Sequence, residues 1–248
     1  MRQIGRSQNI VFEMPETKFS SPDFFKTLNT FAKHHHGTLW LGTRFLPEGE
    51  RFRALSLLVL DGEFYKVATT ASEGMIGQIR LQWWRDEIDR LKEEGAPQGS
   101  LAGQALSGLL ARNPADGLHV HNLINAYDDY LSGANTAYAP QLFSALMDAG
   151  VEGEAHDKTS LAWMAGDVFQ NANSARPDAD RVKQLANRLD KLSDKDWAFL
   201  CLFELLPDWT SKKGGHALQR RWRIWRAFLG GEERLAKRLR RFAESLPG

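Results

Sequence analysis

The chain reads TLWLGTRFLPEGERFRALSLLVLDGEFYKVATTASEGMIGQIRLQWWRDEID from Thr38 to Asp89, and this stretch decides the fold class. Its apolar residues recur at three- and four-residue intervals, which is the period of an amphipathic helix, and no run alternates as a strand does. Pro47-Glu48 is a helix start signal, because proline and acidic residues are favoured in the first helical turn. The stretch therefore predicts two long helices, and the fold class that it indicates is all-α.

The same period continues on both sides of this stretch. Ser21-Pro22-Asp23 and Pro177-Asp178 are further start signals, and Gly133 and Gly230 stand where helices are expected to end. We predict helices at residues 22–35, 48–71, 73–94, 100–112, 117–131, 137–149, 155–173, 178–191, 194–206, 215–229 and 231–245.

The predicted helix 73–94 has faces that can be assigned. Two adjoining apolar stripes predict a wide buried face, with Trp84, Ile88 and Leu91 on one and Ile76, Ile79 and Trp83 on the other. Arg80 and Glu87 fall between these stripes, so we expect them to point inward, paired with each other or facing a polar cavity. Asp86, Asp89 and Glu93 lie opposite the Trp84 stripe, and we expect solvent around them rather than a metal ion.

The stretch from Thr38 resembles the squalene/phytoene synthase family, and it is most similar to the short branch that contains the mitochondrial respiratory complex I assembly factor and its bacterial relatives. The matching elements are Phe45-Leu46-Pro47, the apolar helix ending in Glu63, the Ser72-Glu73 turn and the run IRLQWWRDEID. Further on, the resemblance continues at Asp128-Asp129-Tyr130-Leu131 and at LAWMAGDVFQNANSAR, residues 161–176. It covers about residues 25–190 and implies a single-domain helical bundle of the isoprenoid (terpenoid) synthase type.

Active members of this family join two prenyl diphosphates head to head, with Mg²⁺ held by two DxxxD motifs on facing helices. Such a cluster needs several carboxylates, because Mg²⁺ and diphosphate oxygens are hard partners. At the first motif this chain has Glu63 followed four residues later by Val67, which cannot coordinate a metal. At the second motif Asp167 is followed by the neutral Gln170 and Asn171. Only Glu63 and Asp167 remain as metal ligands, if there are any, and loss of charge from an electrostatic site lowers the rate by orders of magnitude.

The depleted clamp favours a noncatalytic binding or assembly protein, with biogenesis of a respiratory complex as the role that the resemblance implies. The alternative is an active Mg²⁺-dependent prenyltransferase of the squalene/phytoene synthase type. No cofactor is expected unless that alternative holds. A ligand is expected to be apolar and isoprenoid-like. The candidate pocket residues are Glu63, Arg80, Trp83, Glu87, Asp167, Gln170 and Asn171.

The net charge of +1 conceals an asymmetry, because residues 211–248 contain eleven Lys and Arg against Glu232, Glu233 and Glu244. Two amphipathic helices are predicted there, with apolar stripes Leu218, Trp222, Trp225 and Leu229, then Leu235, Leu239, Phe242 and Leu246. We expect the stripes to dock on the acidic body. The basic surface then faces solvent, anionic lipid headgroups or an acidic partner protein. Its members are Arg220, Arg221, Arg223, Arg226, Arg238 and Arg241. No nucleic-acid module is recognised, so no nucleic acid is expected.

These patterns predict an N-terminal arm (1–20), a helical domain (21–210) and basic C-terminal helices packed on it (211–248). The single cysteine, Cys201, excludes an internal disulfide and is expected to be buried. His34-His35-His36 is expected to be an exposed helix end, and His119 and His121 lack a plausible third metal ligand nearby. No apolar run approaches the length of about 18 residues that spans a membrane. The bacterial cytoplasm or the mitochondrial matrix is the expected compartment, with or without peripheral contact to a membrane.

Overall fold

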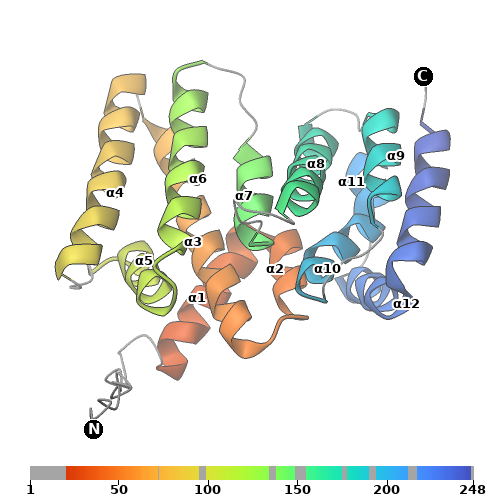
Figure 1. The fold of residues 1–248 in the computed structure, drawn as a ribbon, viewed down its shortest axis with the longest axis horizontal. Coiled ribbons are helices and arrows are strands. Elements are labelled where there is room, and N and C mark those ends of the chain that lie inside the picture. The colour runs from red at the N-terminus through yellow and green to blue at the C-terminus, as the bar shows by residue number, and fades with distance from the viewer. Residues whose placement is uncertain are drawn as a thin grey trace, which may run out of the picture.

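The computed structural model describes residues 21–71, 73–94, 99–133, 138–148, 155–174, 178–189, 194–211 and 217–246, and those residues contain helices and no strand. The all-α prediction is confirmed. The helices, shown in Figure 1, are α1 (Pro22–His35), α2 (Gly37–Thr43), α3 (Glu48–Thr70), α4 (Gly74–Glu94), α5 (Leu101–Arg112), α6 (Asp116–Leu131), α7 (Tyr138–Leu146), α8 (Ala155–Ser174), α9 (Ala179–Asn187), α10 (Asp194–Leu200), the 3₁₀ helix η2 (Cys201–Leu205), α11 (Leu206–Ser211) and α12 (Ala217–Glu244).

Most predicted helix limits agree with the structure to within a few residues, and the differences have local causes. The predicted helix 194–206 is divided, because the backbone tightens into η2 between α10 and α11. The short helix α2 was not predicted. The two predicted terminal helices are joined as α12, but Gly231 breaks the helical path with φ 73° and ψ 174°. The division into domains stays a prediction, and its arm, 1–20, lies outside the described residues.

Helix α3 is the centre of the fold. Residues 54–61 are all buried, which is expected for a helix that is covered on every side. Helices α1, α4, α5, α6 and α7 pack around it. Figure 1 shows α4 and α6 side by side at one end of the molecule, with α9 and α12 at the other.

Helices α7 and α8 approach each other very closely. The reason is Gly166, where an added Cβ would lie 2.4 Å from the Pro140 Cα and 2.5 Å from the Ala139 carbonyl oxygen. Helix α8 also contacts α9 and α11, and α12 packs on α9 and η2, so α8 links the α3 core to the C-terminal helices. Cys201 is fully buried in η2, as predicted.

Candidate functional site

Three of the predicted pocket residues, Glu63, Arg80 and Trp83, line one cavity of about 370 Å³ beside α3 and α4. Its lining is completed by Lys66, Val67, Thr70, Trp84 and Ser100. Glu63 is half-buried, whereas Arg80 and Lys66 are exposed. The cavity therefore has an apolar side, formed by the two tryptophans and Val67, and a polar side with one carboxylate and two cations.

This polar side suits an anionic group better than a metal cluster. A magnesium ion takes oxygen ligands, and a cluster of such ions needs several carboxylates. Glu63 is the only carboxylate in the described lining, and Lys66 and Arg80 offset its charge. The donors present around Glu63 therefore do not fit a magnesium cluster.

Asp167 lies on α8, outside this lining, and its carboxylate already has partners. It accepts a hydrogen bond from Arg181 on α9 and another from Asn171 Nδ2 at 3.1 Å. The Gln170 amide oxygen accepts from the backbone N–H of Ala139 at 3.2 Å, which ties α8 to α7. The three predicted residues of the second motif are thus brought together with each other, but not with Glu63.

Aromatic side chains fill the interior around α3, α6 and α7. The Phe64 ring contacts the rings of Trp84 and Tyr127, with centroids 5.6 and 6.3 Å apart, and Tyr127 stacks on Tyr138 at 5.1 Å. Phe143 meets Phe169 of α8 at 5.4 Å. Phe64 and Phe143 are fully buried and Tyr127 is almost so. The interior between α3, α6, α7 and α8 is therefore packed with aromatic side chains.

The prediction that α4 has a wide buried face made of two apolar stripes is partly wrong. Trp84, Ile88 and Leu91 are buried, but Ile76, Ile79 and Trp83 are exposed, by 38%, 64% and 43%. The reason is that α3, α5 and α6 cover one side of α4 only. Asp86, Asp89 and Glu93 are exposed, as predicted.

Of the two alternatives expected for Arg80 and Glu87, the pairing with each other is wrong, whereas Arg80 does line the Glu63 cavity, as the other alternative expected. Glu87 is buried, but its carboxylate accepts from Arg90 Nε and Nη2, both at 2.7 Å, while Arg80 is exposed. An arginine three residues away on the same helix reaches Glu87 more readily than one seven residues away.

Sequence reasoning missed a buried polar group around Asp61 of α3. Asp61 is 1% exposed, the Tyr127 hydroxyl donates to its Oδ1 at 2.7 Å, and His36 Nε2 lies 3.5 Å from its Oδ2. Burial raises the pKa of the Asp61 carboxyl, and the neighbouring His36 and the Tyr127 hydrogen bond oppose the shift. The signal was an acidic residue inside the apolar run LSLLVLDG. His34 and His35 are exposed at the end of α1, as predicted, but His36 turns toward Asp61.

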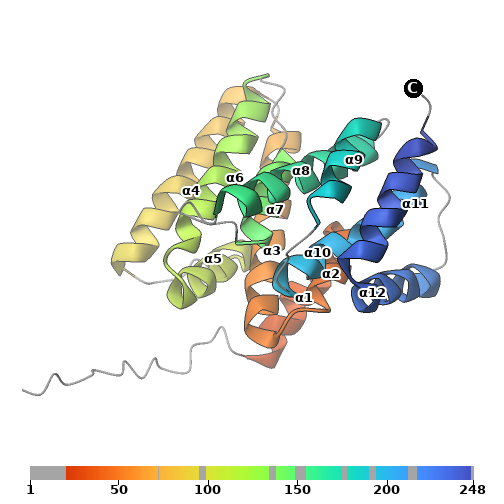
Figure 2. The ribbon, with the colours of Figure 1, turned by 45° about the vertical axis from the view of Figure 1, so that its right-hand side comes forward.

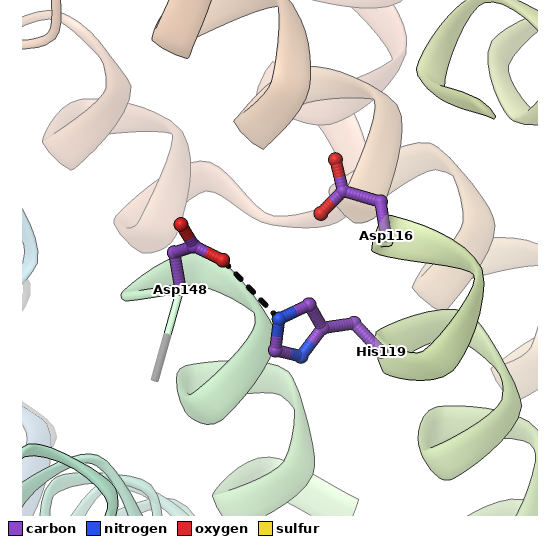
Figure 3. A group of neighbouring side chains, drawn as sticks. All are labelled: Asp116, His119 and Asp148. Carbon is purple, nitrogen blue, oxygen red and sulfur yellow. Dashed lines mark hydrogen bonds and ion pairs between the residues drawn. The ribbon is translucent and has the colours of Figure 1, made fainter. Parts of the chain in front are cut away.

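A second polar group joins Asp116 and His119 of α6 to Asp148, just after α7 (Figure 3). Their ligand atoms lie within 4.8 Å of one another, so the expectation that His119 lacks neighbours of ligand type is wrong. However, Arg53 Nη2 lies 2.6 Å from Asp116 Oδ1 and 3.4 Å from Asp148 Oδ1, and Arg53 Nη1 donates to the Ala145 carbonyl at 2.8 Å. The Arg53 guanidinium supplies the positive charge of this group. Its contacts link α3 to α6 and to the end of α7. Hydrogen bonding from His119 lowers the pKa of Asp148 to about 2.

The C-terminal helix differs from its prediction. In its second half Leu235 and Leu239 are buried, as expected. In its first half the predicted docking stripe faces outward, because the side chains of Leu218, Trp222, Trp225 and Leu229 are 76%, 56%, 44% and 63% exposed. The buried residues there are Ile224 and Ala227, so this half docks by a different face.

Two arginines of the predicted basic surface hold α12 to the body instead. Arg223 donates to both Asp208 carboxylate oxygens, at 2.7 and 2.6 Å, and to the Glu204 carbonyl. Arg238 forms an ion pair with the buried Glu204. Arg221, Arg226 and Arg241 are exposed and Arg220 is half-buried. Among the described residues, no helix is both long and apolar enough to cross a membrane.

Comparison with known proteins gives a family match for part of this helical chain. Residues 32–147, a little under half of the chain, match the family model for squalene/phytoene synthase. This range contains the Glu63 pocket and the Asp61 group but ends before Asp167. Comparisons with curated proteins and with solved structures give no match. The all-α architecture agrees with the isoprenoid synthase-type fold that the matched family implies.

Proposed function

Taking the squalene/phytoene synthase match as the premise, we propose that this chain is a noncatalytic relative of these enzymes that acts as a binding or assembly protein. The observation that supports this proposal most is that the Asp167 carboxylate is bonded to neighbouring side chains. Its carboxylate contacts Arg181 and Asn171, while the adjacent Gln170 bonds the backbone of α7. Groups that would have to bind metal are engaged in holding α7, α8 and α9 together.

The test is turnover of prenyl diphosphates. The purified chain is incubated with farnesyl or geranylgeranyl diphosphate and Mg²⁺, and pyrophosphate release is measured beside a sample without protein. We expect no release above that background, with or without the Asp167→Ala substitution. Mg²⁺-dependent release that Asp167→Ala abolishes would contradict the proposal and establish the transferase alternative.

The Glu63 pocket fits a small anionic group that ends an apolar chain. Lys66 and Arg80 supply positive charge, and Trp83 and Trp84 supply apolar surface. We expect farnesyl diphosphate to bind in the presence of EDTA, without turnover, and Arg80→Ala to weaken that binding about tenfold, because it removes a charged hydrogen-bond donor. Calorimetry measures both, with Lys92→Ala on the far part of α4 as the control. Equal affinities for wild type and Arg80→Ala would exclude this pocket.

The assembly role comes from the resemblance to the assembly-factor branch, and the expected compartment stays the bacterial cytoplasm or the mitochondrial matrix. Removing the chain from its source cell should lower the amount of assembled respiratory complex I, measured on native gels. A normal amount in its absence would contradict the assembly role and leave the binding role standing.

A further inference from the structure

The first half of α12 presents an unusual outer face. Figure 2 shows that the two halves of α12 lie at an angle to each other. The change of direction occurs at Gly231, whose positive φ of 73° ends the first half. Leu218, Trp222, Trp225 and Leu229 follow one another at four, three and four residues, so they share one side of this half, and all are exposed.

This face continues onto α2. Trp40, Leu41 and Phe45 join Leu218, Trp222 and Trp225 in lining a groove of about 510 Å³. Phe45 stacks on Phe228 at 4.6 Å, which fixes α12 against the turn after α2, and Trp222 stacks on Trp225 at 5.0 Å. The groove is therefore a surface made by two parts of the chain that lie far apart in the sequence.

Positive charge surrounds the groove. The Arg44 and Arg221 guanidinium groups each lie 5.8 Å from the centre of the Trp40 ring, and Lys33 Nζ lies 5.5 Å from it. Arg44 and Arg221 also line the groove, and its described lining contains no Asp or Glu. Arg226 is exposed on the same half of α12. An occupant that satisfies this surface must be apolar at its centre and negative around it.

We propose that this Trp–Arg face, formed by the exposed residues Arg44, Leu218, Arg221, Trp222, Trp225 and Leu229, binds peripherally to a membrane surface that contains anionic lipid. Tryptophan is favoured at the level of the headgroups, and a helix with leucine and tryptophan on one side lies in the plane of the interface. Each arginine near an anionic leaflet adds attraction. Such contact needs no membrane-spanning segment.

The experiment is flotation of the full chain with vesicles. One set is phosphatidylcholine alone, and the other is an equimolar mixture with phosphatidylglycerol. The wild-type chain should float with the anionic vesicles, and less so as salt is added, because salt screens the charges. Trp222→Ser with Trp225→Ser should reduce the partition coefficient by roughly tenfold or more, since the variant lacks the two aromatic rings that the wild type buries in the membrane surface.

Two control variants, one matched to the tryptophan variant and one to a variant of the arginines, separate this face from other exposed groups. Trp163→Ser, on α8, removes a tryptophan that is 44% exposed, the same fraction as Trp225, and should float as the wild type does. Arg44→Gln with Arg221→Gln should weaken binding by about fivefold for each charge removed. Lys237→Gln with Arg241→Gln removes two exposed charges from the other half of α12 and should have little effect.

Thermal unfolding by circular dichroism checks that each variant is folded. Equal flotation with neutral vesicles, or unchanged flotation of the tryptophan variant, would overturn the proposal. So would loss of binding in the Lys237 and Arg241 variant alone. A third outcome would also overturn it. If the wild type does not float but forms a dimer in light scattering, and the tryptophan variant is a monomer, then a second copy covers this face instead.

Discussion

Glu63 and Asp167, the two carboxylates that the sequence resemblance predicted as remaining metal ligands, lie in very different surroundings. Glu63 is half-buried in the lining of a cavity that it shares with Lys66 and Arg80. Asp167 belongs to the contact between α8 and α9, where Arg181 and Asn171 bond it. One carboxylate faces a space that a ligand can enter, and the other helps to hold two helices together.

The difference shows that an acidic residue predicted from a motif resemblance does not by itself identify a metal site. In a metal clamp both carboxylates must be available to the same ions. Here the aromatic rings of Phe64, Tyr127 and Phe143 are buried in the interior.

The close packing of α8 against α7, and with it the position of Asp167, depends on Gly166. Gly166→Ala should lower the free energy of unfolding by about 3 kcal/mol, because the new Cβ meets the backbone of α7, which cannot move aside as a flexible side chain would. Gly49→Ala in α3 is the control, since nothing lies within 4 Å of its Cβ position. The control should be neutral or more stable by about 0.5 kcal/mol. Urea unfolding measures both, and equal stability of the two variants would refute the close approach.

Helix α3, which carries Glu63, is anchored by the hydrogen bond from Tyr127 to Asp61. Tyr127→Phe removes the donor and leaves a buried carboxyl oxygen short of one partner, which should cost about 1–3 kcal/mol. Tyr130→Phe, three residues later on α6 and 49% exposed, should change stability by less than about 0.5 kcal/mol. If Tyr127→Phe costs no more than Tyr130→Phe, Asp61 is not held in this way.

The pKa of Asp61 predicts a pH dependence of known sign. Because burial raises this pKa in the folded chain, the protonated carboxyl favours folding. This contribution to the free energy of unfolding is fully present at pH values below 3.8, the ordinary pKa of an aspartate. It is lost as the pH rises through the raised pKa of the folded chain. Asp61→Asn cannot titrate, so the wild type should lose stability relative to this variant as the pH rises through that window. Denaturant unfolding over a pH series measures the difference, and a difference that grows in the opposite direction would mean that the pairing with His36 outweighs burial.

The smallest effect is expected at the surface pair of Asp167 and Arg181. Arg181 is 48% exposed, so Arg181→Ala should cost less than about 1 kcal/mol, and salt should reduce the loss. Lys183→Ala, with a side chain 46% exposed on the same helix, is the control. A loss at Arg181 that is several times larger and insensitive to salt would place Asp167 in a buried network rather than at the edge of one.

The sequence predicted the helices well because apolar spacing and capping residues act locally. Ser21 caps α1, Ser100 caps α5 and Asp178 caps α9, each through its side chain. The site was harder to predict because its partners are distant in the sequence. Tyr127 reaches Asp61 across 66 residues, and Arg53 reaches Asp116 across 63.

The outer face of α12 shows a different limit. Its apolar stripe has the period of a docking surface, and period alone predicts burial. In the structure Ile224 and Ala227 make the contact instead, and Trp222 and Trp225 stay exposed. Which side of an amphipathic helix meets the body depends on the shape of the partner surface, which the sequence of the helix does not contain.

The most direct test of the noncatalytic role is a calorimetric titration of Mg²⁺ into the full chain in the presence of a non-reacting thio analogue of farnesyl diphosphate. We predict that Mg²⁺ does not tighten binding of the analogue, and that Asp167→Ala leaves the affinity for the analogue unchanged. Binding of more than one Mg²⁺ per chain, tightening the analogue and lost in Asp167→Ala, would contradict it.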